Sequence, residues 1–108
     1  MLYELRIYEA LPGRLPRLQQ RFSEDALPLF AQHGIRPVGF WTTYIGPSLN
    51  TLTYILAWED LAERQNRWDA FQNDPTWLAA KERSERDGPL LARVESQILQ
   101  PTAYSALK

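Results

Sequence analysis

Residues 38–58, VGFWTTYIGPSLNTLTYILAW, contain two strand-like segments separated by a loop-forming sequence. Val38–Ile45 and Thr51–Trp58 are both rich in threonine and in aromatic or β-branched residues, which favour β-strands. Between them, GPSLN at residues 46–50 is typical of a hairpin loop. This stretch therefore predicts two neighbouring antiparallel strands, the second apolar enough to lie in the middle of a sheet.

The residues before this hairpin predict one strand and one helix. Leu2–Tyr8 alternates between an apolar face and a mixed face, as a strand does. Residues on one stripe of a helix then recur at steps of three and four: Leu15, Leu18, Phe22, Ala26, Leu29 and His33. Pro28 lacks the amide that a helix interior needs, so we expect a kink near Glu24–Pro28. Gly34 suits the left-handed cap that commonly ends a helix.

The residues after the hairpin predict a second helical region in two parts and a final strand. Asp60 and Glu63 form a capping-box pattern, which begins a helix that reaches about Phe71. Asp74-Pro75 is a second helix start, and this short helix runs to about Arg86. Leu91–Leu99 alternates in character like a strand, and Pro101 ends it.

The order of elements is therefore β-α-β-β-α-β, which predicts an α+β, ferredoxin-like fold. In this plan a four-stranded antiparallel sheet carries its helices on one face. The length of 108 residues suits a single domain, and we expect that domain to span residues 1–108.

Composition excludes several classes of protein. The chain is 44% hydrophobic and 23% charged, which is typical of a globular protein and not of a disordered one. A net charge of −1 argues against a nucleic-acid partner, and Thr51–Trp58 lacks the Lys/Arg-Gly-aromatic signature of RNA-recognition domains. No cysteine is present and no apolar run could span a bilayer, so we expect a cytoplasmic protein with no membrane partner. The chain also opens directly as a strand, without a basic-then-apolar leader.

The sheet is expected to need a partner. Helices cover only one face, yet the two middle strands carry large apolar side chains in both registers, such as Tyr54 and Trp58 in one and Ile55 in the other. An uncovered patch of this kind would be larger than monomers normally expose. We therefore predict a homodimer that forms through the sheet faces.

Five segments in order along the chain carry a resemblance to a known family: residues 3–8 (YELRIY), 27–35 (LPLFAQHGI), 38–41 (VGFW), 58–64 (WEDLAER) and 95–101 (ESQILQP). On these residues the chain resembles the NIPSNAP family over essentially its whole length. The resemblance implies a dimeric α/β barrel built on the ferredoxin-like plan, and it implies no particular reaction.

Polar side chains occur on two strands that are neighbours in this topology: Glu4, Arg6 and Tyr8 on the first, and Arg93, Glu95 and Gln97 on the last. One interpretation is the polar floor of a pocket, in which Arg6 holds an anionic ligand and Glu95 or Glu4 orients it or moves a proton. The favoured interpretation is a cross-strand ion-pair network that sets the strand register.

His33 is the one histidine of the chain. It could serve as a general base, a haem ligand or a proton carrier, but a last-turn histidine that suits the helix C-terminus is the favoured explanation. No paired-histidine or clustered-carboxylate spacing accompanies it, so we expect no metal site. Arg14, Arg17 and Arg21 form a basic stripe on the first helix, for which a solvated face is the usual explanation.

The aromatic residues Trp41, Tyr44, Tyr54 and Trp58 could form the walls of an aromatic-ligand site, although core or dimer contact is their default interpretation. The candidate ligand-binding residues are Arg6, Tyr8, His33, Trp41, Tyr54, Trp58 and Glu95. His33, Arg6 and Glu95 are the catalytic candidates. The sequence thus predicts a homodimer that binds a small, partly aromatic ligand or a protein partner, without a cofactor. A cofactor-independent oxygenase or isomerase is the alternative, by analogy with related dimeric α/β-barrel families.

Overall fold

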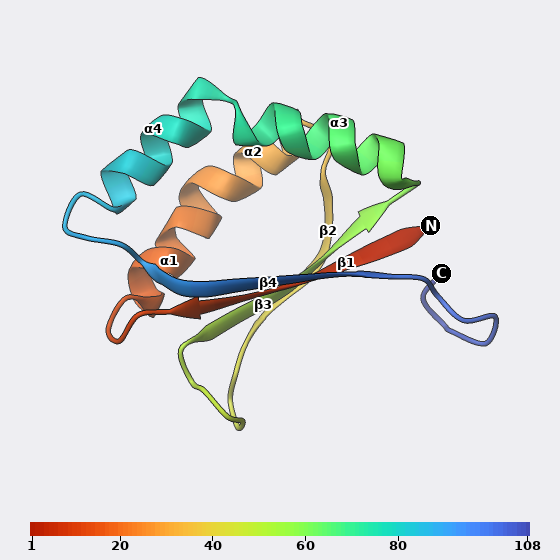
Figure 1. Cartoon of the computed structure of the whole chain (residues 1–108), viewed down its shortest axis with the longest axis horizontal. Helices are drawn as coiled ribbons and strands as arrows, with labels where there is room; N and C mark the ends of the chain where they lie inside the picture. The colour runs from red at the N-terminus through yellow and green to blue at the C-terminus, as the bar shows by residue number, and fades with distance from the viewer.

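The computed structural model describes residues 1–108, and its elements follow the predicted β-α-β-β-α-β order (Figure 1). They are β1 (Leu2–Ala10), α1 (Leu15–Arg21), the π-helix η1 (Phe22–Ala26), α2 (Leu27–Gln32), β2 (Arg36–Thr42), β3 (Thr51–Trp58), α3 (Leu61–Gln72), α4 (Pro75–Ser84) and β4 (Leu91–Leu99). The strands form one antiparallel sheet in the order β2-β3-β1-β4, and the helices lie on one face of it. The predicted α+β, ferredoxin-like fold is confirmed.

The first helical region contains a π-helical turn where the sequence predicts a kink. In η1 the Leu27 amide donates to the Phe22 carbonyl, five residues back instead of four. Pro28 has no amide to donate to Glu24, and its ring would crowd that carbonyl in a regular helix. A wider turn immediately before the proline accommodates both effects.

The predicted helix ends are confirmed at three positions. Asp60 accepts a hydrogen bond from the Glu63 amide at 2.8 Å, and Asp74 accepts one from the Thr76 amide at 2.8 Å. Gly34 has φ of +69°, the left-handed conformation that closes α2. These short-range contacts fix where the helices begin and end.

Strand β2 differs from its predicted bounds. The sequence predicts a strand over Val38–Ile45, whereas the strand covers Arg36–Thr42 and residues 43–50 form the connection to β3. Thr42 opposite Leu52 is the last paired position, so Tyr44 and Ile45 have no strand beside them and are 91% and 88% exposed. Their side-chain chemistry favours a strand, but a strand also needs a partner.

The core lies between the helices and the sheet. Leu52, Tyr54, Leu56 and Trp58 of β3 all point to the helices and are at most 4% exposed. The opposite side, which we call the open face, carries the alternate residues, with Tyr3, Leu5 and Ile7 of β1 beside Ile55 and Ala57 of β3. No helix combines the length and the hydropathy that crossing a membrane requires.

Candidate functional site

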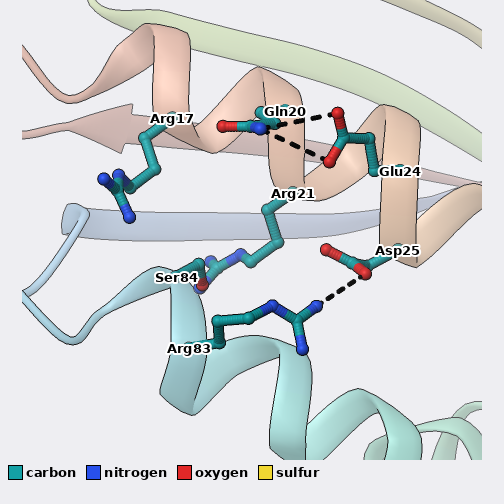
Figure 2. A pocket seen from close by; sticks show the side chains of 7 residues that line it. All are labelled: Arg17, Gln20, Arg21, Glu24, Asp25, Arg83 and Ser84. Carbon is teal, nitrogen blue, oxygen red and sulfur yellow. Dashed lines mark hydrogen bonds and ion pairs between the residues drawn. The ribbon is translucent and has the colours of Figure 1, made fainter.

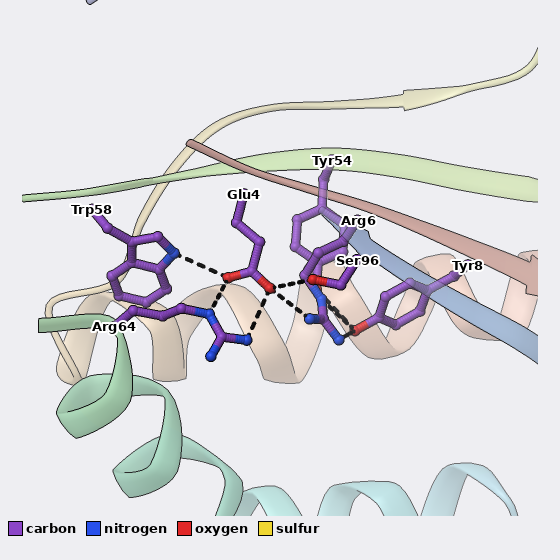
Figure 3. Close-up of polar contacts among 7 residues, drawn as sticks. All are labelled: Glu4, Arg6, Tyr8, Tyr54, Trp58, Arg64 and Ser96. Carbon is purple, nitrogen blue, oxygen red and sulfur yellow. Dashed lines mark hydrogen bonds and ion pairs between the residues drawn. The ribbon is translucent and has the colours of Figure 1, made fainter. Parts of the chain in front are cut away.

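A cluster of hydrogen-bonded polar side chains lies between the sheet and α3, where apolar side chains are usual (Figure 3). We call it the Glu4 cluster; its members are Glu4, Arg6, Tyr8, Tyr54, Trp58, Arg64 and Ser96. The first three are alternate residues of β1, so the pleat of the strand directs them all to the helix side. β3, β4 and α3 supply the other four.

The Glu4 carboxylate is fully buried and accepts five hydrogen bonds. Its Oε1 accepts from Trp58 Nε1 at 3.0 Å and from Arg64 Nε at 2.7 Å. Its Oε2 accepts from Arg6 at 2.8 Å, from Ser96 at 2.7 Å and from Arg64 Nη2 at 3.1 Å. Two oxygens offer about four lone-pair positions, so the carboxylate has no capacity left for a ligand.

These hydrogen bonds keep the Glu4 carboxylate ionised. Burial alone raises the pKa of a carboxyl group, but the hydrogen bonds from Arg64, Ser96 and Arg6 outweigh it and lower the pKa of Glu4 to about 2. Glu4 is therefore a fixed negative charge at neutral pH, and it does not exchange a proton as a general acid or base would.

Arg6 connects the carboxylate to two tyrosines. Its guanidinium donates to Glu4, to the Tyr54 hydroxyl at 3.0 Å and to the Tyr8 hydroxyl at 3.1 Å, and it lies 4.5 Å from the centre of the Trp68 ring. Burial opposes its charge, but the neighbouring tyrosine oxygens and Glu4 more than compensate and raise the pKa of Arg6. With Arg64 also present, the cluster carries two positive charges and one negative charge.

The two tyrosine hydroxyls lie 2.9 Å apart. Burial and the neighbouring Tyr8 raise the pKa of Tyr54 well above its ordinary value, so Tyr54 stays protonated. Arg6 donates to both oxygens, so only one of the two hydroxyl protons has a protein acceptor, namely the other hydroxyl. The pair can thus offer one hydrogen bond to a further acceptor.

The structure brings together four of the residues that the sequence predicts for ligand binding: Arg6, Tyr8, Tyr54 and Trp58. It does not bring Glu95 to them. Ser96 pairs with Arg6 and Glu95 pairs with Ile7, so Glu95 lies on the open face and the expected contact with Arg6 is wrong by one position of register. Trp41 also lies toward the open face, opposite Thr53. The ligand-binding role of these residues stays a prediction.

His33 is separate from the Glu4 cluster. Its Nε2 lies 2.8 Å from the Asp74 carboxylate, and hydrogen bonds from His33 and from the Thr76 amide lower the pKa of Asp74. Because Asp74 also caps α4, this pair ties the end of α2 to the start of α4. Neither residue lines any of the hollows described below, and no group of three or more His, Asp or Glu side chains lies close enough together to hold a metal ion.

Arg64 and Ser96 are members of the site that the sequence does not single out. Arg64 lies one helical turn before Trp68, so both face the sheet from the same side of α3. An arginine and a tryptophan four residues apart are the one local sign of a polar contact beneath this helix. Ser96 has no comparable sign, because its role depends on which residue of β1 lies opposite.

Two hollows have mainly apolar walls. The η1 hollow, about 180 Å³, lies between η1 and the β2–β3 side of the sheet, and its lining is Gln19, Phe22, Ser23, Leu27, Phe40 and Leu52. The tail hollow, about 380 Å³, lies on the open face beneath the C-terminal residues, and its lining includes Tyr3, Ile55, Leu99, Pro101 and Leu107. A third, polar hollow lies between α1 and α4.

Comparisons with known proteins agree on one family. The sequence model of the NIPSNAP family matches residues 3–106. An uncharacterised NIPSNAP domain protein from Burkholderia xenovorans is 30% identical, with 97% of this chain and 98% of that chain covered and a TM-score of 0.84. A NIPSNAP family protein from Agrobacterium tumefaciens is 26% identical, with 99% and 98% covered and a TM-score of 0.87.

A more distant structure shares the fold alone. A putative antibiotic biosynthesis monooxygenase from Nitrosomonas europaea has a TM-score of 0.64 at 8% identity, over 96% of this chain and all of that one. No curated protein matches the chain. Because the family model covers nearly every residue and the solved relatives align from end to end, the chain belongs to the NIPSNAP family.

Proposed function

We propose that this NIPSNAP protein is a homodimer that binds a small, partly aromatic molecule in the η1 hollow of each subunit. The observation that carries the proposal is the chemistry of that hollow. Phe22 and Phe40 are aromatic walls, with ring centres 5.9 Å apart, and Leu27 and Leu52 complete an apolar lining. Gln19 and Ser23 add two polar groups, a combination that suits a ring with a polar substituent.

The position of the hollow also supports a binding role. It lies beside a π-helical turn, a feature that occurs often at functional sites. Behind its walls, Phe22 and Phe40 pack against Tyr54 at ring-centre distances of 5.2 and 5.1 Å, and Tyr54 is held by Arg6. The Glu4 cluster thus gives the inner side of the hollow a rigid support.

The dimer is supported by the composition of the open face. Leu5 and Ile7 lie beside Ile55 on its central strands, and Trp41 and Leu99 toward its edges are 50% and 40% exposed. Two copies of one such face are self-complementary across a two-fold axis. Sedimentation equilibrium at low micromolar concentration should give twice the mass of the chain. A single-chain mass would contradict the dimer and favour a different protein as the partner of this face.

The ligand proposal is tested with benzoate and with hexanoate as its non-aromatic counterpart. Benzoate should raise the melting temperature in a dose-dependent way, and hexanoate should raise it less, because ring stacking is lost. Ser23→Trp would place a large side chain at the exposed edge of the hollow and should weaken benzoate binding by about tenfold or more.

Ala79→Trp, at an exposed position of α4, is the matched control and should bind benzoate like the wild type. Equal binding of benzoate to wild type and to Ser23→Trp, or no preference over hexanoate, would overturn the η1 hollow as the site. The same measurement with 1,4-naphthoquinone, an aromatic molecule without a carboxylate, tests whether the ligand needs that group.

A further inference from the structure

We propose that the polar hollow between α1 and α4 binds a small oxyanion, a phosphate or carboxylate group, through Arg21 and Arg17. This hollow, which we call the arginine pocket, has a volume of about 260 Å³ and no hydrophobic side chain in its lining. It is separate from the η1 hollow, since Gln20 and Glu24 line the arginine pocket whereas Gln19 and Ser23 line the η1 hollow. Benzoate and hexanoate carry the same carboxylate, so the arginine pocket would bind both alike. Only the difference between the two molecules and the loss of binding in Ser23→Trp report on the η1 hollow.

Arg21 is buried beside the Trp77 ring, 5.6 Å away, with fewer hydrogen bonds than a buried guanidinium normally has. Its side chain is 3% exposed and runs from α1 through the pocket toward Ser84 of α4 (Figure 2). Its one protein hydrogen bond goes from Nη1 to the Ser84 hydroxyl at a long 3.3 Å, and the nearest carboxylate, on Glu85, is 3.7 Å away. By contrast, the guanidinium of Arg6 donates four hydrogen bonds in the same protein.

The unpartnered edge of Arg21 has the geometry that oxyanions use. No protein acceptor lies within hydrogen-bond distance of Nε, which is itself buried. Nε and Nη2 form the edge of a guanidinium that binds phosphate and carboxylate groups with two parallel hydrogen bonds. Burial also lowers the pKa of Arg21, which the nearby Glu85 only partly offsets, so an added negative charge would stabilise the charged form.

The lining of the pocket has a net charge of +1, from three arginines and two carboxylates. Asp25 forms an ion pair with Arg83, with a nitrogen–oxygen distance of 3.0 Å, whereas Glu24 accepts from the neutral amide of Gln20 at 3.4 Å and keeps its charge (Figure 2). Arg17 lies one turn before Arg21 on the same side of α1, and its nearest carboxylate is the exposed Asp87 at 3.6 Å. Two arginines at this spacing repel each other, and a shared anion relieves that repulsion.

The test measures inorganic phosphate and acetate binding by calorimetry, with sodium chloride at equal ionic strength as the reference. One phosphate per chain is expected, and the comparison with acetate decides whether the phosphate or the carboxylate chemistry is preferred. Arg21→Gln and the more exposed Arg17→Gln should each weaken binding by about tenfold or more, since each removes charge-assisted hydrogen bonds. Arg36→Gln, which removes an equal charge from β2, should leave binding unchanged.

A spectroscopic readout locates the anion. The Arg21 Nε–H resonance in an ¹H–¹⁵N spectrum should move downfield on addition of the tighter-binding anion, and the same anion should leave the Arg36 Nε–H resonance in place. If Arg21→Gln does not fold, Arg17→Gln and the wild-type Arg21 resonance still test whether the anion binds in the arginine pocket. Three results would each overturn the proposal. They are the failure of both anions to bind more strongly than chloride, unchanged binding in Arg17→Gln, and an Arg21 resonance that stays in place when the anion is added.

Discussion

Glu4 shows how a buried charge can hold several elements together. An isolated carboxylate in a protein interior loses several kcal/mol of solvation free energy. Glu4 replaces that solvation with five donors from β1, β3, β4 and α3, so one side chain links three strands to a helix. The two arginines that donate to it have a counter-charge only while Glu4 is ionised. The charges of the cluster therefore depend on one another, and removing the carboxylate leaves the two guanidiniums without an opposite charge.

Replacing Glu4 with glutamine tests this dependence. Glu4→Gln leaves the guanidiniums of Arg6 and Arg64 without their counter-charge, so the free energy of unfolding at neutral pH should fall by about 3–5 kcal/mol. Urea denaturation measures it. Glu82→Gln, at an exposed position of α4, is the control and should change the free energy by less than about 0.5 kcal/mol. Similar small losses in both variants would contradict a structural role for the Glu4 charge.

The pKa of Glu4 also predicts an acid-sensitive stability. Its folded value of about 2 lies below the ordinary 4.5, so its contribution is fully present above pH 4.5 and is lost as the pH falls toward 2. A shift of this size corresponds to about 3 kcal/mol. Urea unfolding of wild type and Glu4→Gln across this pH range should show converging stabilities at low pH. Parallel curves would mean that Glu4 is not the group responsible.

Among the elements, the junction between α2 and β2 combines a backbone requirement with a side-chain contact. Gly34 has φ of +69°, and its carbonyl accepts a hydrogen bond from Arg67 of α3 at 2.7 Å. A Cβ at this position would lie 1.7 Å from Arg67 Nη1. Gly13 has nearly the same φ, +79°, but a Cβ there would meet nothing within 4 Å. The two glycines therefore separate backbone strain from steric conflict.

Gly13→Ala should cost only the left-handed backbone strain, about 1 kcal/mol of the free energy of unfolding. Gly34→Ala should cost about 1–2 kcal/mol more, because Arg67 must also give up its hydrogen bond to the carbonyl. Chemical denaturation of both variants provides the comparison. In an Arg67→Ala background the two alanine substitutions should cost about the same. An equal loss of unfolding free energy for Gly13→Ala and Gly34→Ala in the wild-type background would show that the Arg67 side chain moves aside without a cost.

The helix ends were predictable from sequence because their causes are local. Asp60, Asp74 and Gly34 each act on backbone atoms within a few residues, so a short window contains the whole interaction. The ends of β2 were not predictable in this way. Tyr44 and Ile45 have strand-forming side chains, but whether they join a strand depends on where β3 begins to pair with Thr42.

Part of the candidate site was predictable because it, too, depends on a local pattern. Alternation along β1 places Glu4, Arg6 and Tyr8 on one face, and the structure confirms that they share it. Which residues of β4 join them depends on a pairing register between segments some ninety residues apart in sequence, and one position separates Ser96 from Glu95. Arg64 reaches the cluster only through the packing of α3 on the sheet, and its spacing from Trp68 is the one local sign of that contact.

At the scale of the whole molecule, all the helices lie on one side of a single sheet. The helix side buries Tyr54, Leu56 and Trp58 almost completely, whereas the open face leaves Leu5, Ile7 and Ile55 only partly covered. Apolar area removed from water is worth roughly 25 cal/mol per Å². A second copy that covered this face would therefore contribute to the stability of both chains, and it would make that stability depend on concentration.

Placing a charge at the centre of the open face tests this dependence. Ile55 pairs with Leu5 on the two central strands, so Ile55→Lys would bury an unpaired charge in the proposed interface. The wild-type melting temperature should rise with protein concentration, as mass action requires of a dimer, and that of Ile55→Lys should not. Light scattering should give a single-chain mass for Ile55→Lys and a dimer for Leu78→Lys, whose leucine is 47% exposed on α4. A dimeric Ile55→Lys protein would place the interface elsewhere, because a central lysine would prevent two such sheets from meeting.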